Sequence, residues 1–403
     1  MATVLLNALA STAGGGVTYL RNVLPRLGRD DDGLSYIVLV PPAQLAACRA
    51  LNSERVRVES LAIRGGMLGR WCWEQTALRW LIHARQVKAL VSLGNFALLT
   101  APVPQLLFNR NALYFSTGFA RDLWARGEYV KWLEHQAKSW LAWRSIKHAT
   151  VNLVPSFAMR EQVRRFVGLS GRITVLPFGF DKNIFSSDNT SLSAELLAKL
   201  DLQPDCRRLL FVSHYNYFRN FETLLRALPE LKRLLRERAG LRVQIVLTTE
   251  LRRGAVYGGY DATAAAALIE QLGVRAEIAM LGSVPYEQLY QLYRMCDGYI
   301  CPSYAESFGH PLVEAMASGL PVVAADLPVH QEICGDAAVY FETFDVQVLA
   351  AQAASVLTDT QLSRSLCHAG AQQIQRYSWD EHVASLICEI KACIGLQGRG
   401  AQN

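Results

Sequence analysis

The chain has 403 residues, of which 51% are hydrophobic and 19% charged, with a formal net charge of +6. This length exceeds one ordinary hydrophobic core and predicts two domains of about 200 residues each. The composition excludes a disordered chain, and no apolar run reaches the ~18–20 residues of a membrane span. Nine cysteines without a CxxC pair or a Cys/His cluster indicate reduced thiols in a cytoplasmic protein and no zinc site.

Positive charge is concentrated toward the N-terminus. Residues 1–177 hold 22 Lys and Arg against 10 Asp and Glu, whereas the remainder holds 19 against 25. A basic N-terminal half favours an anionic partner there, such as a membrane surface, a lipid diphosphate or an acidic glycan. A solvated, Arg-rich surface is the alternative. Nucleic acid is not expected, because no basic run is interleaved with stacking aromatic residues.

The chain begins with a predicted strand at residues 3–9, three glycines at 14–16, and apolar residues at helical spacing from Val17. Strand, glycine loop and helix are the opening of a Rossmann-like domain. The loop lacks GxGxxG, which disfavours a dinucleotide site, and a turn required only by packing is the alternative to ligand binding. The acidic run at 30–32 lies away from the expected ligand crevice, and we interpret it as a solvated turn.

Polar and aromatic residues distinguish the rest of this half. The predicted strand at 103–108 is followed by Asn109, Arg110 and Asn111, which can hold a phosphate or a hydroxyl. Residues 121–148 have helical period, four tryptophans, and six Lys and Arg against three acidic residues. Aromatic and basic residues together can bind a membrane interface. The simpler expectation is that the tryptophans face the core.

Pro177 and Gly179 follow a further predicted strand and indicate a linker between domains. We therefore predict an N-terminal domain at residues 1–177 and a second domain at 178–375. A final helix with a frayed tail is expected at 376–403.

The most informative stretch is CPSYAESFGHPLVEAMASGLPVV at residues 301–323. Gly309 lets the backbone approach a ligand closely, and Pro311 suits the first turn of a helix. Free N–H groups at a helix N-terminus, with the positive end of the helix dipole, can bind a diphosphate. Glu306 precedes this entrance and Glu314 lies within the helix. A surface helix with two solvated carboxylates would leave the Phe-Gly-His-Pro entrance unexplained.

Glu306 and Glu314 are separated by seven residues, and the surrounding frame closely resembles the E-x7-E motif of the retaining GT-B glycosyltransferases of family 4. The segment at 173–185 and RYSWD at 376–380 resemble two further signatures, so the resemblance covers nearly the whole chain. It implies an α/β protein of the GT-B fold, with two Rossmann-like α/β/α domains facing a cleft. The C-terminal helix would return to the N-terminal domain.

The resemblance also implies a function. A retaining glycosyltransferase of this kind moves a sugar from a nucleotide-diphospho-sugar donor to a glycan or lipid-linked acceptor, without a metal or another cofactor. The protein would be cytoplasmic, and its basic N-terminal half leaves open a peripheral contact with the anionic inner face of the cell membrane.

The resemblance further implies site residues. Glu306 and Arg219 are the expected catalytic residues. In the family a Gly-Arg and a later Lys clamp the diphosphate, and here His214 and Arg219 occupy the two cationic places. The acceptor-side candidates are Asn109, Arg110 and Asn111, where many relatives have a His. The donor-binding candidates are Gly15, Gly16, His214, Asn220, Ser283, Val284, Ser307, Phe308, Gly309, His310, Pro311, Leu312 and Glu314.

Other interpretations of the same residues stay open. A glycosidase could use the two glutamates as acid and nucleophile, and a GT-B epimerase or phosphorylase is a lesser alternative. A sugar-nucleotide-binding protein without transferase activity would fit the departures at His214 and Asn109.

Overall fold

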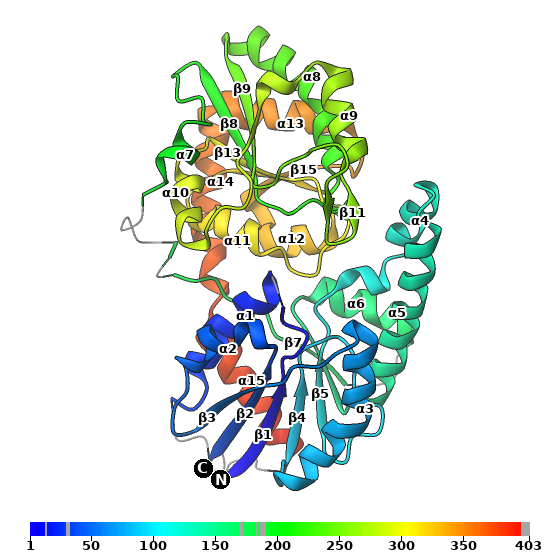
Figure 1. Cartoon of the computed structure of the whole chain (residues 1–403). Coiled ribbons are helices and arrows are strands. Elements are labelled where there is room, and N and C mark those ends of the chain that lie inside the picture. Colours follow the sequence, from blue (N-terminus) through cyan, green and yellow to red (C-terminus); the bar gives the residue numbers. More distant parts are fainter. Residues whose placement is uncertain (13, 30–32, 169–171, 183, 186–190, 396–403) are drawn as a thin grey trace. The chain divides into compact units, whose positions relative to one another are not determined.

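The computed structural model (Figure 1) describes residues 1–12, 14–29, 33–168, 172–182, 184–185 and 191–395. The acidic turn expected at 30–32 and the frayed tail at 396–403 lie outside the described residues. The chain forms two compact units, of which unit 1 consists of Met1–Gly179 with Ser378–Asn403 and unit 2 of Phe180–Tyr377. The divisions follow Gly179 and Tyr377, each two residues beyond the predicted domain limit.

Unit 1 is built on a parallel sheet with the strand order β3-β2-β1-β4-β5-β6-β7. Its central strands are buried almost without interruption, as in parallel sheets that helices cover on both faces. The strands are β1 (Ala2–Asn7), β2 (Leu34–Val40), β3 (Val56–Ser60), β4 (Ala89–Ser92), β5 (Gln105–Phe108), β6 (Val151–Val154) and β7 (Arg172–Val175). The helices are α1 (Gly15–Val23), α2 (Pro42–Arg49), α3 (Gly66–Ala84), α4 (Thr117–Ala125), α5 (Tyr129–His148), α6 (Phe157–Val167) and α15 (Trp379–Cys393). Helices α1, α2 and α15 lie on one side of the sheet, and α3, α5 and α6 on the other (Figure 1).

The last helix, α15, is part of unit 1, which confirms the predicted return to the N-terminal domain. A Cβ atom on Gly179 would lie 2.2 Å from the backbone nitrogen of Trp379, so only glycine permits this close approach. His382 Nε2 lies 3.0 Å from the Tyr19 hydroxyl of α1, and His382 Nδ1 lies 2.9 Å from the Pro177 carbonyl oxygen. Burial lowers the pKa of His382 to about 4, so the ring is uncharged at neutral pH.

The expectation that the tryptophans of residues 121–148 face the core is wrong for Trp124 and Trp140, whereas Trp143 packs against the core of unit 1. Trp124 and Trp140 are 55% and 61% exposed, and the other two are half-buried. The fully buried residues of α5 are mostly small or polar, namely His135, Ser139, Ala142 and Ser145, and Ile146 is the large apolar side chain among them. The large apolar side chains that α4 and α5 expose, which we call the aromatic face, are Trp124, Tyr129, Val130, Leu133 and Trp140.

Unit 2 has a second parallel sheet with the order β12-β9-β8-β13-β14-β15. The strands are β8 (Cys206–Phe211), β9 (Arg242–Leu247), β12 (Ile278–Met280), β13 (Gly298–Cys301), β14 (Val322–Ala325) and β15 (Ala338–Phe341), with a small hairpin of β10 (Val256–Tyr257) and β11 (Tyr260–Asp261). The helices are α7 (Ala194–Leu197), α8 (Phe221–Ala239), α9 (Thr263–Leu272), α10 (Leu289–Arg294), α11 (His310–Ala317), α12 (Pro328–Cys334), α13 (Val346–Thr358) and α14 (Thr360–Gln373).

Each sheet reverses its strand order beside its first strand, between β1 and β4 in unit 1 and between β8 and β13 in unit 2. Loops that leave the carboxyl ends of such neighbouring strands run in opposite directions and open a ligand crevice. The sequence-predicted site residues follow the carboxyl ends of β1, β5, β8, β12 and β13. Among the described helices of both units, none is long and apolar enough to cross a membrane.

Candidate functional site

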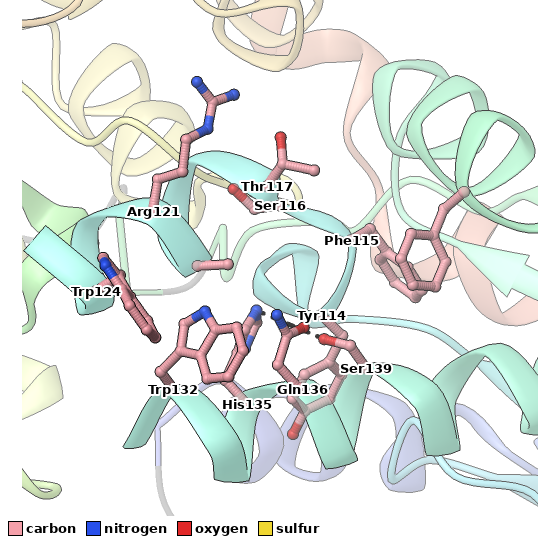
Figure 2. Close-up of a pocket in the computed structure, with 12 residues that line it drawn as sticks. Tyr114, Phe115, Ser116, Thr117, Arg121, Trp124, Trp132, His135, Gln136 and Ser139 are labelled. Atoms are coloured by element: carbon pink, nitrogen blue, oxygen red, sulfur yellow. Dashed lines mark hydrogen bonds between the residues drawn. The ribbon is translucent and has the colours of Figure 1, made fainter. Parts of the chain in front are cut away.

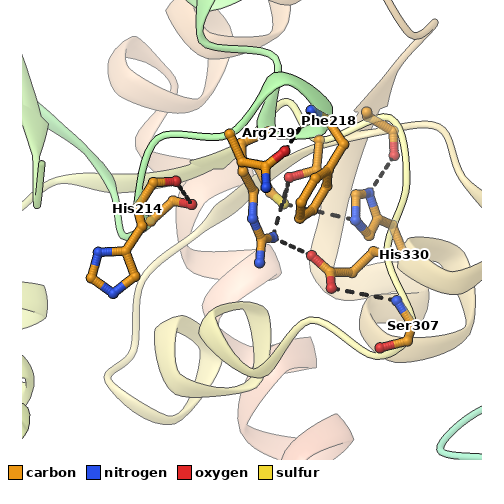
Figure 3. A network of polar contacts seen from close by, with 11 residues as sticks. His214, Phe218, Arg219, Ser307 and His330 are labelled. Atoms are coloured by element: carbon orange, nitrogen blue, oxygen red, sulfur yellow. Dashed lines mark hydrogen bonds and ion pairs between the residues drawn. The ribbon is translucent and has the colours of Figure 1, made fainter. Parts of the chain in front are cut away.

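Glu306 and Arg219 meet at the strand-order reversal of unit 2 (Figure 3). Glu306 lies in the loop after β13, and Arg219 ends the short 3-10 helix Tyr217–Arg219 after β8. Arg219 Nη1 donates to Glu306 Oε2 and, at 3.4 Å, to Ser303 Oγ. Sequence analysis predicted both residues but missed this ion pair, because nothing in the linear sequence indicates that β8 and β13 are neighbours.

The ion pair is largely shielded from water, since the side chains of Arg219 and Glu306 are only 23% and 11% exposed. Burial acts to lower the pKa of Arg219, but Glu306 together with the neighbouring Cys301 and Tyr299 outweighs this effect, and the pKa is raised. The guanidinium is therefore charged at every pH of interest. Both contacts use Nη1, which leaves the donors of Nε and Nη2 able to bind another anion.

The predicted helix entrance is present next to this pair. Helix α11 begins at His310, one residue before the predicted start, and its N-cap is Gly309 with φ 87°. A Cβ atom on Gly309 would lie 2.9 Å from Leu312 Cδ1 and 3.6 Å from Glu306 Cγ, so glycine is needed here and Glu306 borders the entrance. No side chain caps the first turn of α11. An uncapped helix N-terminus of this kind is a suitable seat for an anion.

The other predicted residues of this entrance have different surroundings. Phe308 is buried, and its ring centroid lies 5.2 Å from that of His310 and 5.4 Å from that of Tyr377. The backbone N–H of Leu312 donates to the Gly309 carbonyl at 3.0 Å, and its side chain is buried. The buried side chains of Phe308 and Leu312 therefore pack beneath the N-terminus of α11. Ser307, His310 and Pro311 are half-buried at its surface.

Glu314 occupies a separate environment on the same helix. Its side chain is buried, and its Oε2 accepts a hydrogen bond of 3.1 Å from the Tyr293 hydroxyl of α10. Burial raises the pKa of Glu314 to about 7, which the hydrogen bonds from Tyr293 and Tyr286 only partly oppose. Its charge thus depends on pH in the physiological range.

The remaining donor-side candidates of unit 2 lie on its loops. His214 is exposed, and its ring points away from the Arg219–Glu306 pair (Figure 3). Asn220 is buried with φ 57°, its Nδ2 donates to the Pro302 carbonyl at 3.0 Å, and its Oδ1 accepts a bond of 2.7 Å from Thr223 Oγ1. Asn220 therefore ties the two loops together beside Arg219. Ser283 is exposed and Val284 half-buried after β12.

Sequence reasoning missed a polar cluster behind Arg219 (Figure 3). Cys301 Sγ lies 3.7 Å from Ser303 Oγ and 3.7 Å from His330 Nε2, and His330 Nδ1 lies 2.8 Å from the Ala325 carbonyl oxygen. Burial acts to raise the pKa of Cys301, but the neighbouring imidazole lowers it overall. Polar contacts thus connect His330, through Cys301 and Ser303, to Arg219.

The acceptor-side candidates of unit 1 are engaged within their own loop. Asn109 is fully buried, and its Nδ2 donates to Asn152 Oδ1 at 3.2 Å. Arg110 donates to the Leu93 carbonyl at 2.8 Å and lies over the Tyr19 ring, and burial lowers its pKa. Asn111 caps the next turn by accepting from the N–H of Leu113.

The glycine loop of unit 1 leads into α1, whose first turn has no side-chain cap. A Cβ atom on Gly16 would lie 3.0 Å from Ser11 Cα, whereas one on Gly15 would meet only open space. At the carboxyl end of β1, Asn7 Nδ2 donates to Glu74 Oε1 at 2.9 Å. Across the described part of both units, no group of three or more His, Cys, Asp and Glu side chains could hold a metal ion.

Comparisons with known sequences agree with the resemblance. Residues 193–373 match the family of glycosyl transferases group 1. The chain is 30% identical over 229 residues to a D-inositol 3-phosphate glycosyltransferase of Segniliparus rotundus, covering 55% of this chain and 47% of the relative. It is also 30% identical over 135 residues to O-antigen chain mannosyltransferase B of Escherichia coli, covering 34% of this chain and 35% of the relative. The chain thus spans about half the length of such relatives, or less.

Solved structures resemble nearly the whole chain. Sucrose-phosphate synthase of Thermosynechococcus elongatus has a TM-score of 0.74 at 17% identity, over 98% of this chain and 100% of that one. HepE of Anabaena, solved with UDP and glucose, has a TM-score of 0.70 at 19% identity, over 97% and 100%. WaaG, a glycosyltransferase involved in lipopolysaccharide biosynthesis, has a TM-score of 0.67 at 13% identity, over 96% and 99%. These likenesses confirm the predicted GT-B fold.

Proposed function

We propose that this chain, which has the GT-B fold and matches the glycosyl transferases of group 1 over residues 193–373, transfers a sugar from a nucleotide-diphospho-sugar to a glycan or lipid-linked acceptor. The observation that carries the proposal is the Arg219–Glu306 ion pair beside the uncapped N-terminus of α11. HepE, a structural neighbour, has been solved with UDP-glucose, which supports a donor of this class.

The proposed mechanism needs no metal. Glycosyl transfer passes through an oxocarbenium-like state while negative charge grows on the leaving diphosphate. The free donors of Arg219 and the N–H groups at Gly309 and His310 are preorganised to stabilise that charge. Glu306 holds Arg219 in place, and its carboxylate favours positive charge on the sugar ring. We propose retention of the anomeric configuration, as the E-x7-E resemblance implies.

Nucleotide binding tests this proposal directly. Among UDP, GDP, ADP, dTDP and CMP, we expect one diphosphate to raise the melting temperature. Saturation at about 100 times Kd corresponds to roughly 2.7 kcal/mol of added stability. The shift should persist in EDTA, because no metal is needed. Stabilisation by NAD alone would contradict the proposal, and a shift that EDTA abolishes and Mg²⁺ restores would contradict the metal-free mechanism.

We also propose peripheral contact with an anionic membrane through the aromatic face. Three of the six basic residues on α4, α5 and their connection pair with the three acidic ones there. Within the described chain, Arg121, Arg144 and Lys147 have no carboxylate within ion-pair distance, although the latter two lie over the rings of Trp140 and Trp143. Apolar side chains flanked by unpaired cations suit the surface of a bilayer of anionic lipids.

Sedimentation with vesicles tests the membrane contact. The protein should pellet with phosphatidylglycerol vesicles at low salt and be released at high salt, since screening weakens the attraction. Trp140→Ser should reduce the bound fraction severalfold, whereas Trp80→Ser on α3, which is 70% exposed outside the aromatic face, should not. Equal binding to phosphatidylcholine vesicles would contradict the electrostatic contribution.

A further inference from the structure

Unit 1 contains a cavity of about 560 Å³ between the chain from Tyr114 through α4, helix α5 and the end of α6 (Figure 2). This volume lies within the roughly 300–1,000 Å³ that small-molecule sites occupy. The cavity lies outside the donor site of unit 2 and involves none of the predicted site residues.

The surface that lines the cavity is mainly apolar, and five of its twelve lining residues are aromatic: Tyr114, Phe115, Trp124, Trp132 and Phe166. Figure 2 shows Trp132, His135, Gln136 and Ser139 along one wall, from α5, and Trp124 at one end. Burial lowers the pKa of His135, so its ring is uncharged at neutral pH. An apolar, uncharged interior of this kind suits a hydrocarbon chain.

The only charged group among the twelve described lining residues at neutral pH is the exposed guanidinium of Arg121. It extends from α4 away from the interior (Figure 2) and has no carboxylate within ion-pair distance in the described chain. A phosphate could bind there while an attached chain enters the cavity.

The cavity adjoins the aromatic face through a shared side chain. Trp124 belongs to both, and its ring lies edge-on to Tyr129 at 4.9 Å and to Trp132 at 5.2 Å between centroids. A lipid whose phosphate lies at the bilayer surface could therefore pass its chain from the aromatic face to the cavity without exposing it to water.

We propose that this cavity binds the hydrocarbon chain of an anionic lipid, with the phosphate of that lipid at Arg121. The inference rests on the proposed function, because it identifies the lipid as the anchor of a lipid-linked acceptor. The anchor would hold the acceptor on unit 1 while its sugar end stays free to react.

Calorimetric titration with farnesyl phosphate, below its micelle concentration and without vesicles, tests the inference. Ala120 is half-buried in the lining, and Ala120→Trp fills the cavity, so affinity should fall at least tenfold. Ala125→Trp, on the same helix but outside the lining, should leave affinity unchanged. Arg121→Gln, an exposed change that should not disturb folding, should weaken farnesyl phosphate about tenfold and leave the binding of farnesol unchanged.

All three variants should bind UDP as the unaltered protein does. Measuring UDP binding therefore distinguishes a failure of the cavity proposal from a failure of the donor-site proposal. Equal loss of farnesyl phosphate affinity in the Ala125→Trp protein would overturn the assignment of the cavity. Undiminished affinity in the Arg121→Gln protein would overturn the role of Arg121, and no binding by the unaltered chain would overturn the inference as a whole.

Discussion

Changing Arg219 to alanine is expected to lower turnover by roughly 100- to 1,000-fold, the loss seen when one preorganised charge-stabilising donor is removed. The structure predicts a second effect of the Arg219→Ala substitution. Without Arg219, the Glu306 carboxylate stays largely buried with no cation beside it, close to where the diphosphate would carry negative charge. The variant should therefore also bind the nucleoside diphosphate more weakly, while nucleoside affinity changes little.

Two further variants separate these effects. Combining Arg219→Ala with Glu306→Gln removes the uncompensated carboxylate, so part of the diphosphate affinity should return although turnover stays low. Arg226→Ala is the matched control, because Arg226 is exposed on α8 and has no part in the ion pair. Unchanged diphosphate affinity in the Arg219→Ala protein would move the cationic role to Arg110 or His214.

The two carboxylates are expected to give different kinetic defects when each is changed to glutamine. In the proposed mechanism Glu306, which borders the helix entrance, contacts the reacting sugar more strongly as charge develops, so Glu306→Gln should mainly lower kcat. We propose that Glu314 accepts a hydrogen bond from the donor ribose in ground and transition states alike, so Glu314→Gln should mainly raise the donor KM. Steady-state kinetics of both variants, with thermal unfolding as a folding control, measures the difference.

The dependence of the donor KM on pH gives a second measure of Glu314. Because burial raises its pKa to about 7, a growing fraction of Glu314 is protonated as pH falls below 7. A protonated carboxyl loses acceptor capacity, so the KM should rise below pH 7 and level off above it. Glu314→Gln should abolish this dependence, and a KM independent of pH between 6 and 8 in the unaltered protein would contradict the assigned role.

The glycosidase alternative predicts another outcome for the same proteins. Removal of either an acid or a nucleophile would abolish hydrolysis with little change in KM. The configuration of the transferred sugar, read by NMR, tests the retaining mechanism, and an inverted product would contradict it.

The features that could be predicted from the sequence follow local rules, which depend only on residues close together in the chain. The entrance of α11 was predicted within one residue, because glycine permits the positive φ of the residue before the helix and the fixed φ of proline suits the first turn. The Rossmann-like opening of unit 1 was predicted from a strand, a glycine loop and a helical period, and the fold of two such domains was predicted by resemblance. The return of the last helix was predicted by resemblance, and the contact of Gly179 with Trp379 shows what makes it sterically possible.

Trp124 of α4 and Trp140 of α5 show where local rules fail. Hydrophobicity assigned them to the core, but α5 buries small and polar residues such as Ser139 and Ala142 and leaves Trp140 exposed. Which side of a helix is buried depends on how closely its neighbours approach, and the sequence of that helix does not contain this information.

The sequence by itself determined the elements of this protein, the two-domain division and the helix entrance that can bind a diphosphate, since each depends on residues close together in the chain. The tertiary structure alone decided that Arg219 pairs with Glu306, 87 residues away, and that Cys301 and His330 lie behind them. It also decided that Asn109 and Asn111 hydrogen-bond within the protein. These contacts follow from strand order, because only neighbouring strands in a sheet bring the loops at their carboxyl ends together.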